Sequence, residues 1–483
     1  MVNRGVPRFE ENPFSLGVGA GDPVADGFVL WTRVAPDPFG VRQPAREDIP
    51  VNWEIAEDYG FSTIIRAGQV LAHHEHGHSI HVHVAGLEHG REYFYRFHCA
   101  GATSPVGRAL TCPDMGGGLD SLRLALCCCQ SYTDGFYAAY RDVADQVPDL
   151  VVHVGDYIYE RPLYTGVRAM PTPEAVSLDD YRKYHAVTKT DPHLQAAHAI
   201  APWLAIWDDH EVVDDYRALH APAGHTSASF RSRRAAAYKA YYEHMPLRLP
   251  DGSGGAQMQL YRRVGFGNLA QFDLLDTRQY RSDHPCRTPD GLEPPWISCD
   301  VADPNRSLLG GAQESWFARG FGAWQTKWNF VVQTTQVTPY ERLVSGGLKF
   351  SSDRWDAYPA SRERLVEVIR DKASGNTVVL GGDIHAFLLT TLTDESGNAI
   401  ASELITGAIS SGGGGEERYE EETRYHRARN IPFYYENRTN GYLALELQPQ
   451  TLTVKVRSLE SVLEPDSQLE TIQVWEVDRS RNQ

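Results

Sequence analysis

A dense group of ionisable side chains follows the apolar run at residues 204–207. It consists of five carboxylates and one histidine, which are Asp208, Asp209, His210, Glu211, Asp214 and Asp215. Five like charges at the end of an apparently buried strand repel one another and destabilise any compact arrangement. The sequence therefore predicts that cations lie between or beside these side chains.

Three other apolar runs also end in groups that bind metal ions. These groups are Cys129, Gln130, Asp156, Tyr159, Glu160, Asp383 and His385. Any one of them is more often part of a turn or a helix cap. Ligand sites in α/β sheets lie just beyond the carboxyl ends of the strands, so four such strand ends together predict one metal site.

The ligand types narrow the chemistry. Carboxylates alone suit magnesium, calcium or manganese, whereas imidazole, thiolate and phenolate indicate a transition metal, and a phenolate favours ferric iron. A mixed set predicts two or more ions, and Asp156 could bridge ions about 3.5–4 Å apart. Such a site is suited to the hydrolysis of phosphate esters.

Strands and a helix alternate in the part of the chain that carries these groups. Residues 122–130 and 148–156 read as continuous apolar strands, and residues 135–146 between them have a helical pattern. This order is typical of parallel strands in an α/β sheet. The same strand pattern recurs at 202–210, 269–277, 328–336 and 376–385, and the segment from residue 441 predicts a hairpin.

The N-terminal part has a different pattern. Short runs rich in Val, Ile, Tyr and Phe, separated by Gly, Pro and Asp, predict a small β-sandwich. The sequence thus predicts an N-terminal β domain at 1–115, a catalytic domain at 120–460 and a C-terminal tail at 461–483. The Gly-rich acidic stretch at 410–426 predicts a loop.

Composition excludes several classes of protein. The chain has 483 residues and a formal net charge of −17, which disfavours binding to nucleic acid or to anionic membranes. No run of about 18 apolar residues predicts a membrane span. No signal peptide is visible at the start of the sequence, which leaves a cytosolic protein or a secreted one without its leader.

The seven cysteines bear on that choice. Cys127, Cys128 and Cys129 are consecutive, and the other four form two local pairs, Cys99 with Cys112 and Cys286 with Cys299. Each pair spans a Gly/Pro-containing stretch that suits a disulfide-closed loop. Unpaired buried thiols are the alternative for each pair. Two disulfides would place the protein outside the reducing cytosol.

Several longer stretches resemble the PhoD-type alkaline phosphatases, distant relatives of the purple acid phosphatases in the metallophosphoesterase superfamily. They are "FSLGVGAGDPVADGFVLWTRVAP", "CQSY", "PDLVVHVGDYIYE", "WDDHEVVDDY", "DTRQYR" and "LGGDIH". The resemblance spans residues 14 to about 442. It implies an αββα metallophosphoesterase sandwich with an N-terminal all-β, fibronectin-like sandwich, and it implies export from the cytosol to the periplasm, the cell surface or the medium.

The resemblance also implies Fe³⁺ and Ca²⁺ in one site. The implied ligands are Cys129, Asp156, Tyr159, Asp208, Asp209, Asp383 and His385. Cys129 and Tyr159 would bind iron, and Asp156 would bridge. Asp383 replaces a histidine of the purple enzymes. Asp214 and Asp215 stand where family members often have asparagines, so the calcium shell of this chain differs.

His210 is implied to contact the phosphate without binding metal, either stabilising charge or protonating the leaving group. Arg278 could bind the phosphate through two N–H donors, or it could pair with Asp276 and hold its loop. His153 is expected to hydrogen-bond within the core or to a residue that supports the metal ligands. In the "CCC" run, Cys127 and Cys129 share one face of a strand and Cys128 faces the other side. Adjacency to Gln130 favours Cys129 as the ligand.

The implied reaction is hydrolysis of a phosphate monoester or diester by a metal-bound hydroxide. A phospholipase D-like diesterase of the same superfamily is the nearest alternative. A non-catalytic metal- or carbohydrate-binding surface protein is a more distant one, which the intact ligand set disfavours.

Two further motifs suggest other sites. The histidine-rich segment at 73–83 could bind metal, but its place in the β region favours a solvated loop and strand edge. The glycines of residues 17–23 lack the G-x-G-x-x-G spacing of a dinucleotide loop. The absence of a G-x-S-x-G motif disfavours a serine hydrolase.

Overall fold

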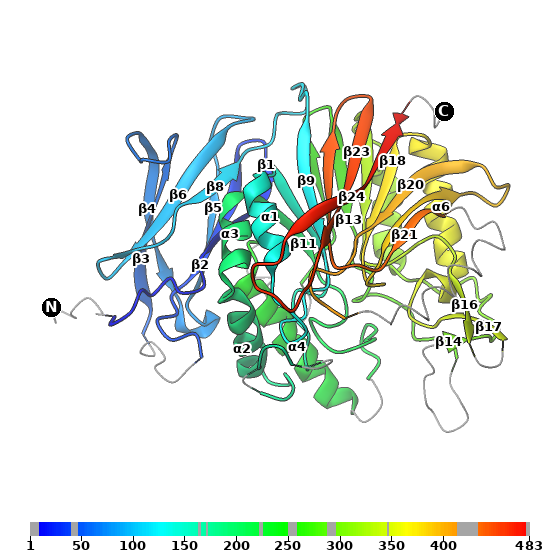
Figure 1. Cartoon of the computed structure of the whole chain (residues 1–483), viewed down its shortest axis with the longest axis horizontal. Coiled ribbons are helices and arrows are strands. Elements are labelled where there is room, and N and C mark those ends of the chain that lie inside the picture. Colours follow the sequence, from blue (N-terminus) through cyan, green and yellow to red (C-terminus); the bar gives the residue numbers. More distant parts are fainter. Residues whose placement is uncertain are drawn as a thin grey trace.

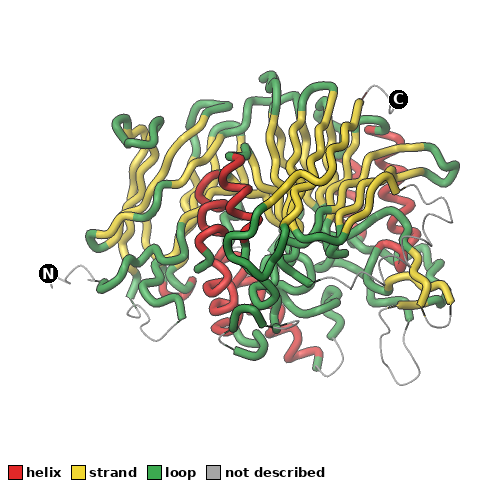
Figure 2. The backbone as a smooth tube through the Cα atoms, viewed as in Figure 1, coloured by secondary structure: helices red, strands yellow, loops and turns green. Residues whose placement is uncertain are grey.

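The computed structural model describes residues 9–39, 47–162, 166–170, 172–221, 226–249, 258–286, 296–344, 347–412 and 433–479. Strands fill the upper part of the view in Figure 2 and loops gather on its lower side, while helices lie at the centre and on the right. The fold is a mixed α/β arrangement of several sheets and few helices. No helix within these ranges is both long and apolar enough to cross a membrane.

A large sheet crosses the middle of the molecule (Figure 1). Its strands, in spatial order, are β24 (Leu469–Asp478), β23 (Thr451–Leu459), β22 (Gly441–Leu447), β9 (Leu122–Cys127), β10 (Leu150–Val154), β11 (Pro202–Ile206), β1 (Val18–Val24), β2 (Gly27–Arg33) and β5 (Ser79–Val84). The four strands β9, β10, β11 and β1 are parallel neighbours. The strand–helix–strand prediction at 122–156 is therefore confirmed.

A second sheet carries the remaining predicted strands. Its order is β12 (Arg262–Phe266), β13 (Ala270–Leu274), β15 (Trp328–Val332), β18 (Thr377–Gly381), β20 (Ala399–Ile405), β19 (Phe387–Thr393) and β21 (Phe433–Asn437). From β13 to β20 the neighbours are parallel. Every residue of β13, β15 and β18 is buried, as expected of strands covered on both faces.

The helices pack against these sheets. They are α1 (Ala138–Gln146), α2 (Leu178–Lys189), α3 (Pro192–Ile200), α4 (Ser227–His244), α5 (Gly311–Gly320) and α6 (Pro359–Ala373), with short 3₁₀ turns η1 (His74–His76) and η2 (Trp355–Ala357). One hydrophobic cluster contains residues of both sheets and of α1–α4. Another joins the second sheet to α5 and α6. Both sheets are thus fixed by burial of apolar side chains.

The N-terminal strands belong partly to the large sheet. A smaller sheet contains β4 (Ile64–Ala72), β3 (Ile49–Ala56), β6 (Glu92–Cys99) and β7 (Ala102–Thr103), and β8 (Gly107–Leu110) pairs with β6. A third, short sheet is formed by β14 (Trp296–Ile297), β17 (Gly347–Ser351) and β16 (Glu341–Val344). One apolar cluster joins Leu30 of β2 to Val51 of β3, so the smaller sheet faces β1, β2 and β5.

β1 connects the N-terminal region to the rest of the chain. Ala20 and Gly21 pair in parallel register with Pro202 and Trp203 of β11. A Cβ atom at Gly21 would lie 2.3 Å from the carbonyl oxygen of Pro246, so only glycine fits there. The glycine-rich motif at 17–23 is therefore a strand with close backbone contacts, in agreement with the exclusion of a dinucleotide loop.

The C-terminal region differs from the predicted tail. Residues 441–459 form the predicted hairpin of β22 and β23. β24 then pairs along β23 as the edge strand of the large sheet. Its exposed and partly buried residues roughly alternate, which is the pattern of an edge strand with one covered face, so the prediction of a tail at 461–483 is wrong. The predicted loop at 410–426 falls mostly on residues 413–432, which lie outside the described residues.

The histidine-rich segment lies at the edge strand β5 and in η1, as the sequence analysis favoured. The imidazole of His81 stacks on Tyr242 of α4 with 4.3 Å between ring centroids, and its Nε2 lies 2.9 Å from the carbonyl oxygen of Met245. His73 pairs with Asp48. None of the described residues of this segment belongs to a group with metal-ligand spacing.

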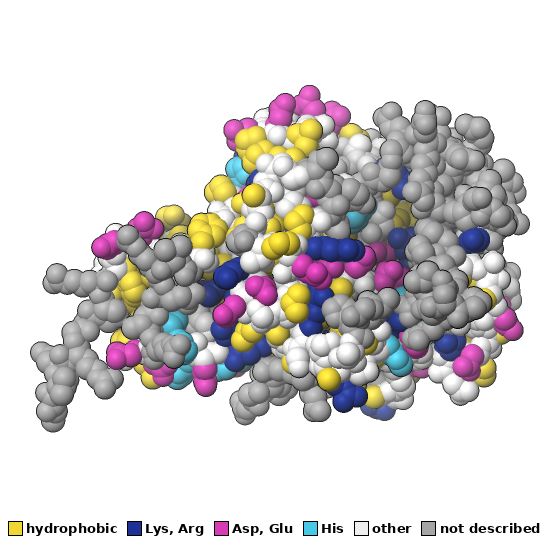
Figure 3. Space-filling model, turned by 90° about the horizontal axis from the view of Figure 1, so that it is seen from below, with side chains coloured by type: hydrophobic (Ala, Val, Ile, Leu, Met, Phe, Trp, Pro, Cys, Tyr) yellow, Lys and Arg dark blue, Asp and Glu magenta, His cyan; other side chains and the backbone are white. Residues whose placement is uncertain are grey.

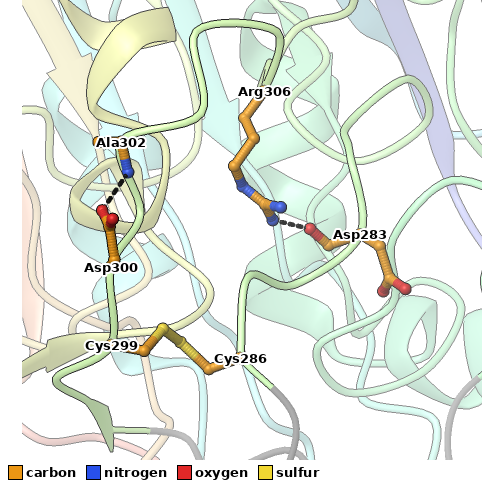
Figure 4. Close-up of a disulfide and its surroundings, with 6 residues drawn as sticks. All are labelled: Asp283, Cys286, Cys299, Asp300, Ala302 and Arg306. Atoms are coloured by element: carbon orange, nitrogen blue, oxygen red, sulfur yellow. Dashed lines mark hydrogen bonds between the residues drawn. A yellow bond between two sulfur atoms is a disulfide. The ribbon is translucent and has the colours of Figure 1, made fainter.

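One of the two predicted disulfides is present and the other is wrong. Cys286 and Cys299 are bonded (Figure 4). Cys99 and Cys112 are free and buried. In the antiparallel pair of β6 and β8, Glu92 faces Leu110, which puts Cys112 at the opposite end of β6 from Cys99. At about 3.4 Å per residue the two thiols lie roughly 25–30 Å apart, too far for a disulfide.

The first prediction is a thiol count. Unreduced, denatured and metal-stripped protein should show five reactive thiols, those of Cys99, Cys112, Cys127, Cys128 and Cys129. The measurement is titration with a chromogenic thiol reagent before and after reduction, which should add two thiols. A count of three before reduction would restore the Cys99–Cys112 disulfide and refute the pairing register of β6 with β8.

Candidate metal centre

Four strand ends meet at one place. Cys129 follows β9, the segment 156–159 follows β10, Asp209 follows β11, and His385 follows β18. The Sγ of Cys129 lies 3.5 Å from Oδ2 of Asp156, and the hydroxyl of Tyr159 donates to the same oxygen at 3.0 Å. The Tyr159 hydroxyl also lies 3.1 Å from Nε2 of His385. A thiol, a phenol, an imidazole and a carboxylate thus converge, as the sequence predicted.

The backbone at this place has an uncommon conformation. Positive φ angles occur at Cys129 (56°), Asp156 (58°), Asp383 (67°) and His385 (52°). Non-glycine residues rarely adopt the left-handed region, and each such residue costs about 1–3 kcal/mol. The chain accepts this cost at four predicted ligands because each strand must turn sharply to aim its side chain into the same space.

Two further groups of possible ligand atoms adjoin the first. Cys129, Asp156 and His385 form one group, Asp156, Asp209 and His210 a second, and Asp209, Asp214 and Asp215 a third, each with its ligand atoms within 4.8 Å of one another. Asp156 belongs to the first and second groups, and Asp209 to the second and third. The shared carboxylates give the geometry needed to bridge neighbouring cations.

His210 is held by a carboxylate to which the sequence assigned no separate role. Its Nδ1 lies 2.7 Å from Oε2 of Glu160, which is fully buried. Burial disfavours the charged imidazole, but the carboxylates of Asp209 and Glu160 outweigh this effect and hold the pKa of His210 well above its ordinary value. Its Nε2 lies 3.8 Å from Oδ1 of Asp214. His210 is therefore a positively charged donor with a fixed orientation.

Two predicted ligands pair with arginines. Asp208 accepts a hydrogen bond from Nε of Arg278, and Asp383 accepts one from Nε of Arg354 at 2.8 Å. Neither aspartate belongs to the three groups of possible ligand atoms. Asp383 also accepts from the hydroxyl of Thr335 at 2.6 Å.

The side chain of Arg278 is enclosed by other residues and does not face solvent. Its side chain is 0% exposed and also binds Asp353 at 2.7 Å. Of the two roles considered from the sequence, its contacts favour holding the loop. The predicted partner is wrong in part, because Asp276 accepts a hydrogen bond from the backbone N–H of Arg278 and not from its guanidinium. The side chain pairs with Asp208 instead, since the segments that follow β11 and β13 meet at this edge.

Burial and mutual repulsion raise the proton affinity of the carboxylates. Burial, opposed by Arg278, raises the pKa of Asp208 to about 6. Burial and the neighbouring Cys129 raise the pKa of Asp156 well above its ordinary value. The pKa of Asp215 is also raised well above normal, by burial and then by Asp353 and Asp209. Bound cations would reverse these shifts by stabilising the ionised forms.

Carboxylate oxygens without a hydrogen-bond partner indicate whether cations would fit this centre. Oδ1 of Asp156 and Oδ2 of Asp208 are buried and accept no hydrogen bond in the described part of the chain. A buried carboxylate oxygen without a donor is costly, and a cation is the partner that satisfies it without adding a proton. The donor set contains hard carboxylates together with soft thiolate and imidazole. It fits a mixed centre with one transition metal and harder ions such as Ca²⁺.

Glu211 does not face this centre, although the sequence placed it among the clustered carboxylates. Its buried carboxylate accepts hydrogen bonds from the backbone N–H groups of Tyr157 (2.6 Å), Asp208 (2.8 Å) and Asp156 (3.2 Å). It therefore braces the two turns that carry Asp156 and Asp208. Burial, opposed by these hydrogen bonds, raises the pKa of Glu211 to about 7.

Three other side chains of this region were not predicted from the sequence. Oδ1 of Asp353 lies within hydrogen-bond distance of Arg278, Arg281 and His284. Arg354 reaches Asp383, and Ser411 donates to the Tyr159 hydroxyl at 2.8 Å. Asp353 and Arg354 lie in a segment without a recognisable pattern, so only the fold brings them here.

The charged surface of this side is visible in Figure 3, which views the molecule from below. Acidic side chains in magenta gather near the middle of the face, next to Lys and Arg side chains in dark blue. Arg161, which is about half exposed, pairs with Asp214 at 2.7 Å. The centre is thus bordered by charges of both signs.

Comparison with known proteins gives a consistent assignment. Residues 124–456 match the family described as PhoD-like phosphatase, and residues 2–113 match the PhoD-like phosphatase N-terminal domain. The chain is 40% identical over 476 residues to "Alkaline phosphatase D" of Bacillus subtilis (strain 168), which covers 96% of this chain and 81% of the relative. The solved "Structure of PhoD" has a TM-score of 0.90 at 37% identity, covering 98% of this chain and 92% of the other.

The brace formed by Glu211 generates the second prediction. Glu211→Gln replaces one acceptor oxygen by an N–H₂ group that faces backbone donors. Each weakened charge-assisted hydrogen bond is worth about 1.5–3 kcal/mol. Metal content should fall, and amide hydrogen exchange at residues 156–158 should quicken.

Glu314→Gln is the matched control, because Glu314 on α5 also accepts several hydrogen bonds, but from Ser307 and from Arg364 of α6. It should lower thermal stability with metal content unchanged. Full metal content and unchanged exchange in Glu211→Gln would contradict the bracing role.

Proposed function

The chain belongs to the PhoD-like phosphatase family and hydrolyses phosphoric ester bonds, and from this premise we propose a metal-dependent hydrolase of phosphate monoesters and diesters. One observation carries the proposal. Asp156 is shared between the group with Cys129 and His385 and the group that contains Asp209, in which His210 lies beside the two carboxylates. A shared carboxylate between two ligand sets is the arrangement that two-cation hydrolysis of phosphate esters requires.

The proposed centre contains Fe³⁺ and Ca²⁺. Cys129, Tyr159 and His385 converge on Asp156, and their thiolate and phenolate character supports ferric iron at this end. The oxygen-only group of Asp209, Asp214 and Asp215 supports calcium at the other end. Asp208 and Asp383 join the set if they exchange their arginine partners for a cation. When bound, such cations acidify a water molecule and neutralise the phosphoryl oxygens.

The protein side chains orient the substrate and the transferred proton. Glu160 occupies Nδ1 of His210, so Nε2 is the atom left to meet the substrate. The proposed role of His210 is to donate a hydrogen bond from Nε2 to the phosphate and a proton to the departing alkoxide. Against the effect of burial, the carboxylates of Asp209 and Glu160 raise the pKa of His210 and so favour the protonated imidazole. Arg278 is buried, so we assign it to positioning Asp208 and not to the phosphate.

The fold supports a finer architectural proposal. Helices α1–α4 and the two sheets share one core, and α5 and α6 cover the second sheet, which supports an αββα catalytic unit at about 120–460. The facing sheets of residues 9–113 support a fibronectin-like N-terminal sandwich that remains joined through β1. The Cys286–Cys299 disulfide supports a location outside the reducing cytosol.

The third prediction tests the function itself. Protein purified without chelators should hydrolyse both an aryl phosphate monoester and a bis-aryl phosphate diester, and elemental analysis should find iron and calcium. Removal of metal by chelation should abolish both activities, and readdition should restore them. Full activity in the chelated protein would refute metal dependence. Activity on neither ester class would refute the proposed substrates.

The fourth prediction concerns His210. His210→Ala should lower turnover by about 10²–10⁴-fold, the range for a lost proton donor or electrostatic partner. Metal content should not change. Loss of metal in this variant would make His210 a ligand and its proposed role wrong.

The variant Glu160→Gln separates the orientation of His210 from its charge. It removes an anion that stabilises the imidazolium, so the pKa of His210 falls and its proton is lost at a lower pH. In the pH profile of turnover, the fall at high pH should then begin at a lower pH, and activity at neutral pH should be less affected. His81→Ala is the control, because His81 lies at β5 far from the centre in the sheet order.

The fifth prediction concerns the three consecutive cysteines. Cys129→Ser replaces a soft charged ligand by a hard neutral one, so iron content, visible absorption and activity should all fall. Cys127→Ser and Cys128→Ser should keep the iron, since Cys127 lies in β9 and Cys128 packs against Gly382. Equal loss of iron in all three variants would indicate misfolding. If only Cys129→Ser retained iron, the thiolate ligand would be another of the three cysteines, and the assignment of Cys129 would be wrong.

A further inference from the structure

A second cluster of ionisable side chains fills the core between β2, β10 and helices α2–α4. It has no assigned role in catalysis. Its members are Arg33, His153, His185, Lys189, His198 and His244, all buried. Several of their ring nitrogens lack a hydrogen-bond partner, namely both of His153, both of His185 and Nδ1 of His198. A buried polar cluster with this many unsatisfied atoms is uncommon.

Lys189 is the central residue of this cluster. Its side chain is 1% exposed, and its Nζ lies 3.2 Å from Nε2 of His198. The Nζ also lies 4.3 Å from the ring centroid of Trp31 and 5.1 Å from that of Tyr157. No carboxylate of the described residues forms an ion pair with it. A buried ammonium without an anionic partner is strongly disfavoured.

The surroundings of Lys189 offer no compensating negative charge. The titratable groups that face it are Arg33 from β2, His153 from β10, Tyr157, His185 from α2, His198 from α3 and His244 from α4. Glu243, which acts on Arg33, is paired with Arg182, and Asp191, which acts on Tyr157, is paired with Arg168. Burial lowers the pKa of Lys189 well below its ordinary value. Among the described residues, the rings of Trp31 and Tyr157 favour the ammonium form.

Tyr157 connects this cluster to the metal centre. It follows Asp156 directly, and its backbone N–H is one of those held by Glu211. Its side chain points the other way, and its hydroxyl lies 2.8 Å from Nε2 of His198. The segment 156–159 is therefore anchored at Tyr157 from two sides, through the backbone by Glu211 and through the hydroxyl by His198.

His198 cannot serve both of its neighbours fully. Its Nε2 carries either one proton or one lone pair, yet it contacts both the Tyr157 hydroxyl and Lys189. When Lys189 is an uncharged amine, the hydroxyl of Tyr157 is free to donate to this lone pair. When Lys189 is an ammonium, three N–H donors and a full charge compete for it, and the charged donor is the stronger partner.

We propose that Lys189, His198 and Tyr157 form a positioning relay that holds segment 156–159 when Lys189 is uncharged and loosens it when Lys189 takes up a proton. The relay contacts neither substrate nor metal. It acts on catalysis through Tyr157, which neighbours Asp156 and lies two residues before Tyr159. It goes beyond the proposed function, because the anchoring of the segment does not depend on which ions the centre holds.

The relay has a defined direction with pH. Lys189 binds a proton less readily in the folded chain than in the unfolded one. Its contribution to stability is therefore present above the ordinary lysine pKa and is lost as the pH falls toward the lowered value in the fold. The anchor on residues 156–159 weakens in the same direction. The proposal thus links the lower pH limit of activity to a residue remote from the reacting atoms.

Two variants separate this relay from simple packing. Lys189→Met keeps an unbranched chain but cannot take up a proton, so the anchor should hold at all pH values. The acid limb of kcat should move at least about one pH unit lower, with alkaline kcat within about threefold of wild type. Tyr157→Phe removes only the hydroxyl. It should lower alkaline kcat by about fivefold or more, with KM within about twofold and a flatter acid limb.

Hydrogen exchange gives a readout independent of catalysis and of the metal assignment. In metal-loaded wild-type protein, amide exchange over residues 150–162, corrected for its intrinsic pH dependence, should quicken as the pH is lowered. It should stay slow in Lys189→Met and be fast at all pH values in Tyr157→Phe. Lys183→Met, on the same helix and partly exposed, is the control for loss of one lysine charge and should behave as wild type.

Specific results would overturn the relay. If both variants follow the wild-type pH dependence of kcat and exchange, the cluster has no positioning role. If Lys189→Met loses activity equally at all pH values while Tyr157→Phe is unaffected, Lys189 has only a packing role. If Lys189→Met does not fold, Tyr157→Phe still decides, because unchanged alkaline kcat and slow exchange in that variant refute the anchor. These outcomes do not affect the assays of metal dependence.

Discussion

Repulsion among buried carboxylates is the interaction on which this structure depends. Asp156, Asp208, Asp209 and Asp215 lie close enough to raise one another's proton affinity, and burial strengthens the effect. The protein supplies part of the balancing charge through Arg278, Arg354 and the imidazolium of His210. Buried carboxylate oxygens without donors remain among the described residues, and bound cations at these positions would complete the balance.

The parallel strands in the middle of both sheets provide the arrangement that such a centre needs. Parallel strands place their carboxyl ends at one edge, and the shared core fixes the two edges side by side. The left-handed residues at the strand ends then turn side chains from different strands into one space. Their unfavourable backbone conformations persist because the surrounding strands are fully buried and cannot relax. Packing energy far from the centre therefore maintains its geometry.

Two groups of side chains support the centre, one of buried carboxylates and one of buried bases. Glu211 and Glu160 are buried anions whose charge is spread over backbone N–H groups or an imidazolium. The cluster around Lys189 consists of bases, and within the described part of the chain no carboxylate pairs with Lys189 itself. Tyr157 lies between the two and touches both. The segment 156–159 is thus held between a negative brace on one side and an uncharged, proton-sensitive anchor on the other.

The sequence by itself determined the strand–helix–strand pattern, the strand ends that bear chemistry and the family. Each of these depends on local features, because apolar runs and the polar residues that follow them are read within about ten positions. It also identified the Cys286–Cys299 disulfide, whose two cysteines close a short loop. The Cys99–Cys112 pair has the same spacing but spans an antiparallel pair of strands, so spacing alone led to the wrong answer.

Only the tertiary structure decided which carboxylates face the centre and which brace it. Glu211 adjoins His210 in the chain, yet its side chain turns to three backbone N–H groups, because the turn after β11 points it away from the other acids. Arg278 and Asp353 are 75 residues apart and meet through the folding of the second sheet. The contact of Lys189 with His198 and Tyr157 joins α2, α3 and the end of β10. Such partnerships depend on long-range packing, which local patterns do not encode.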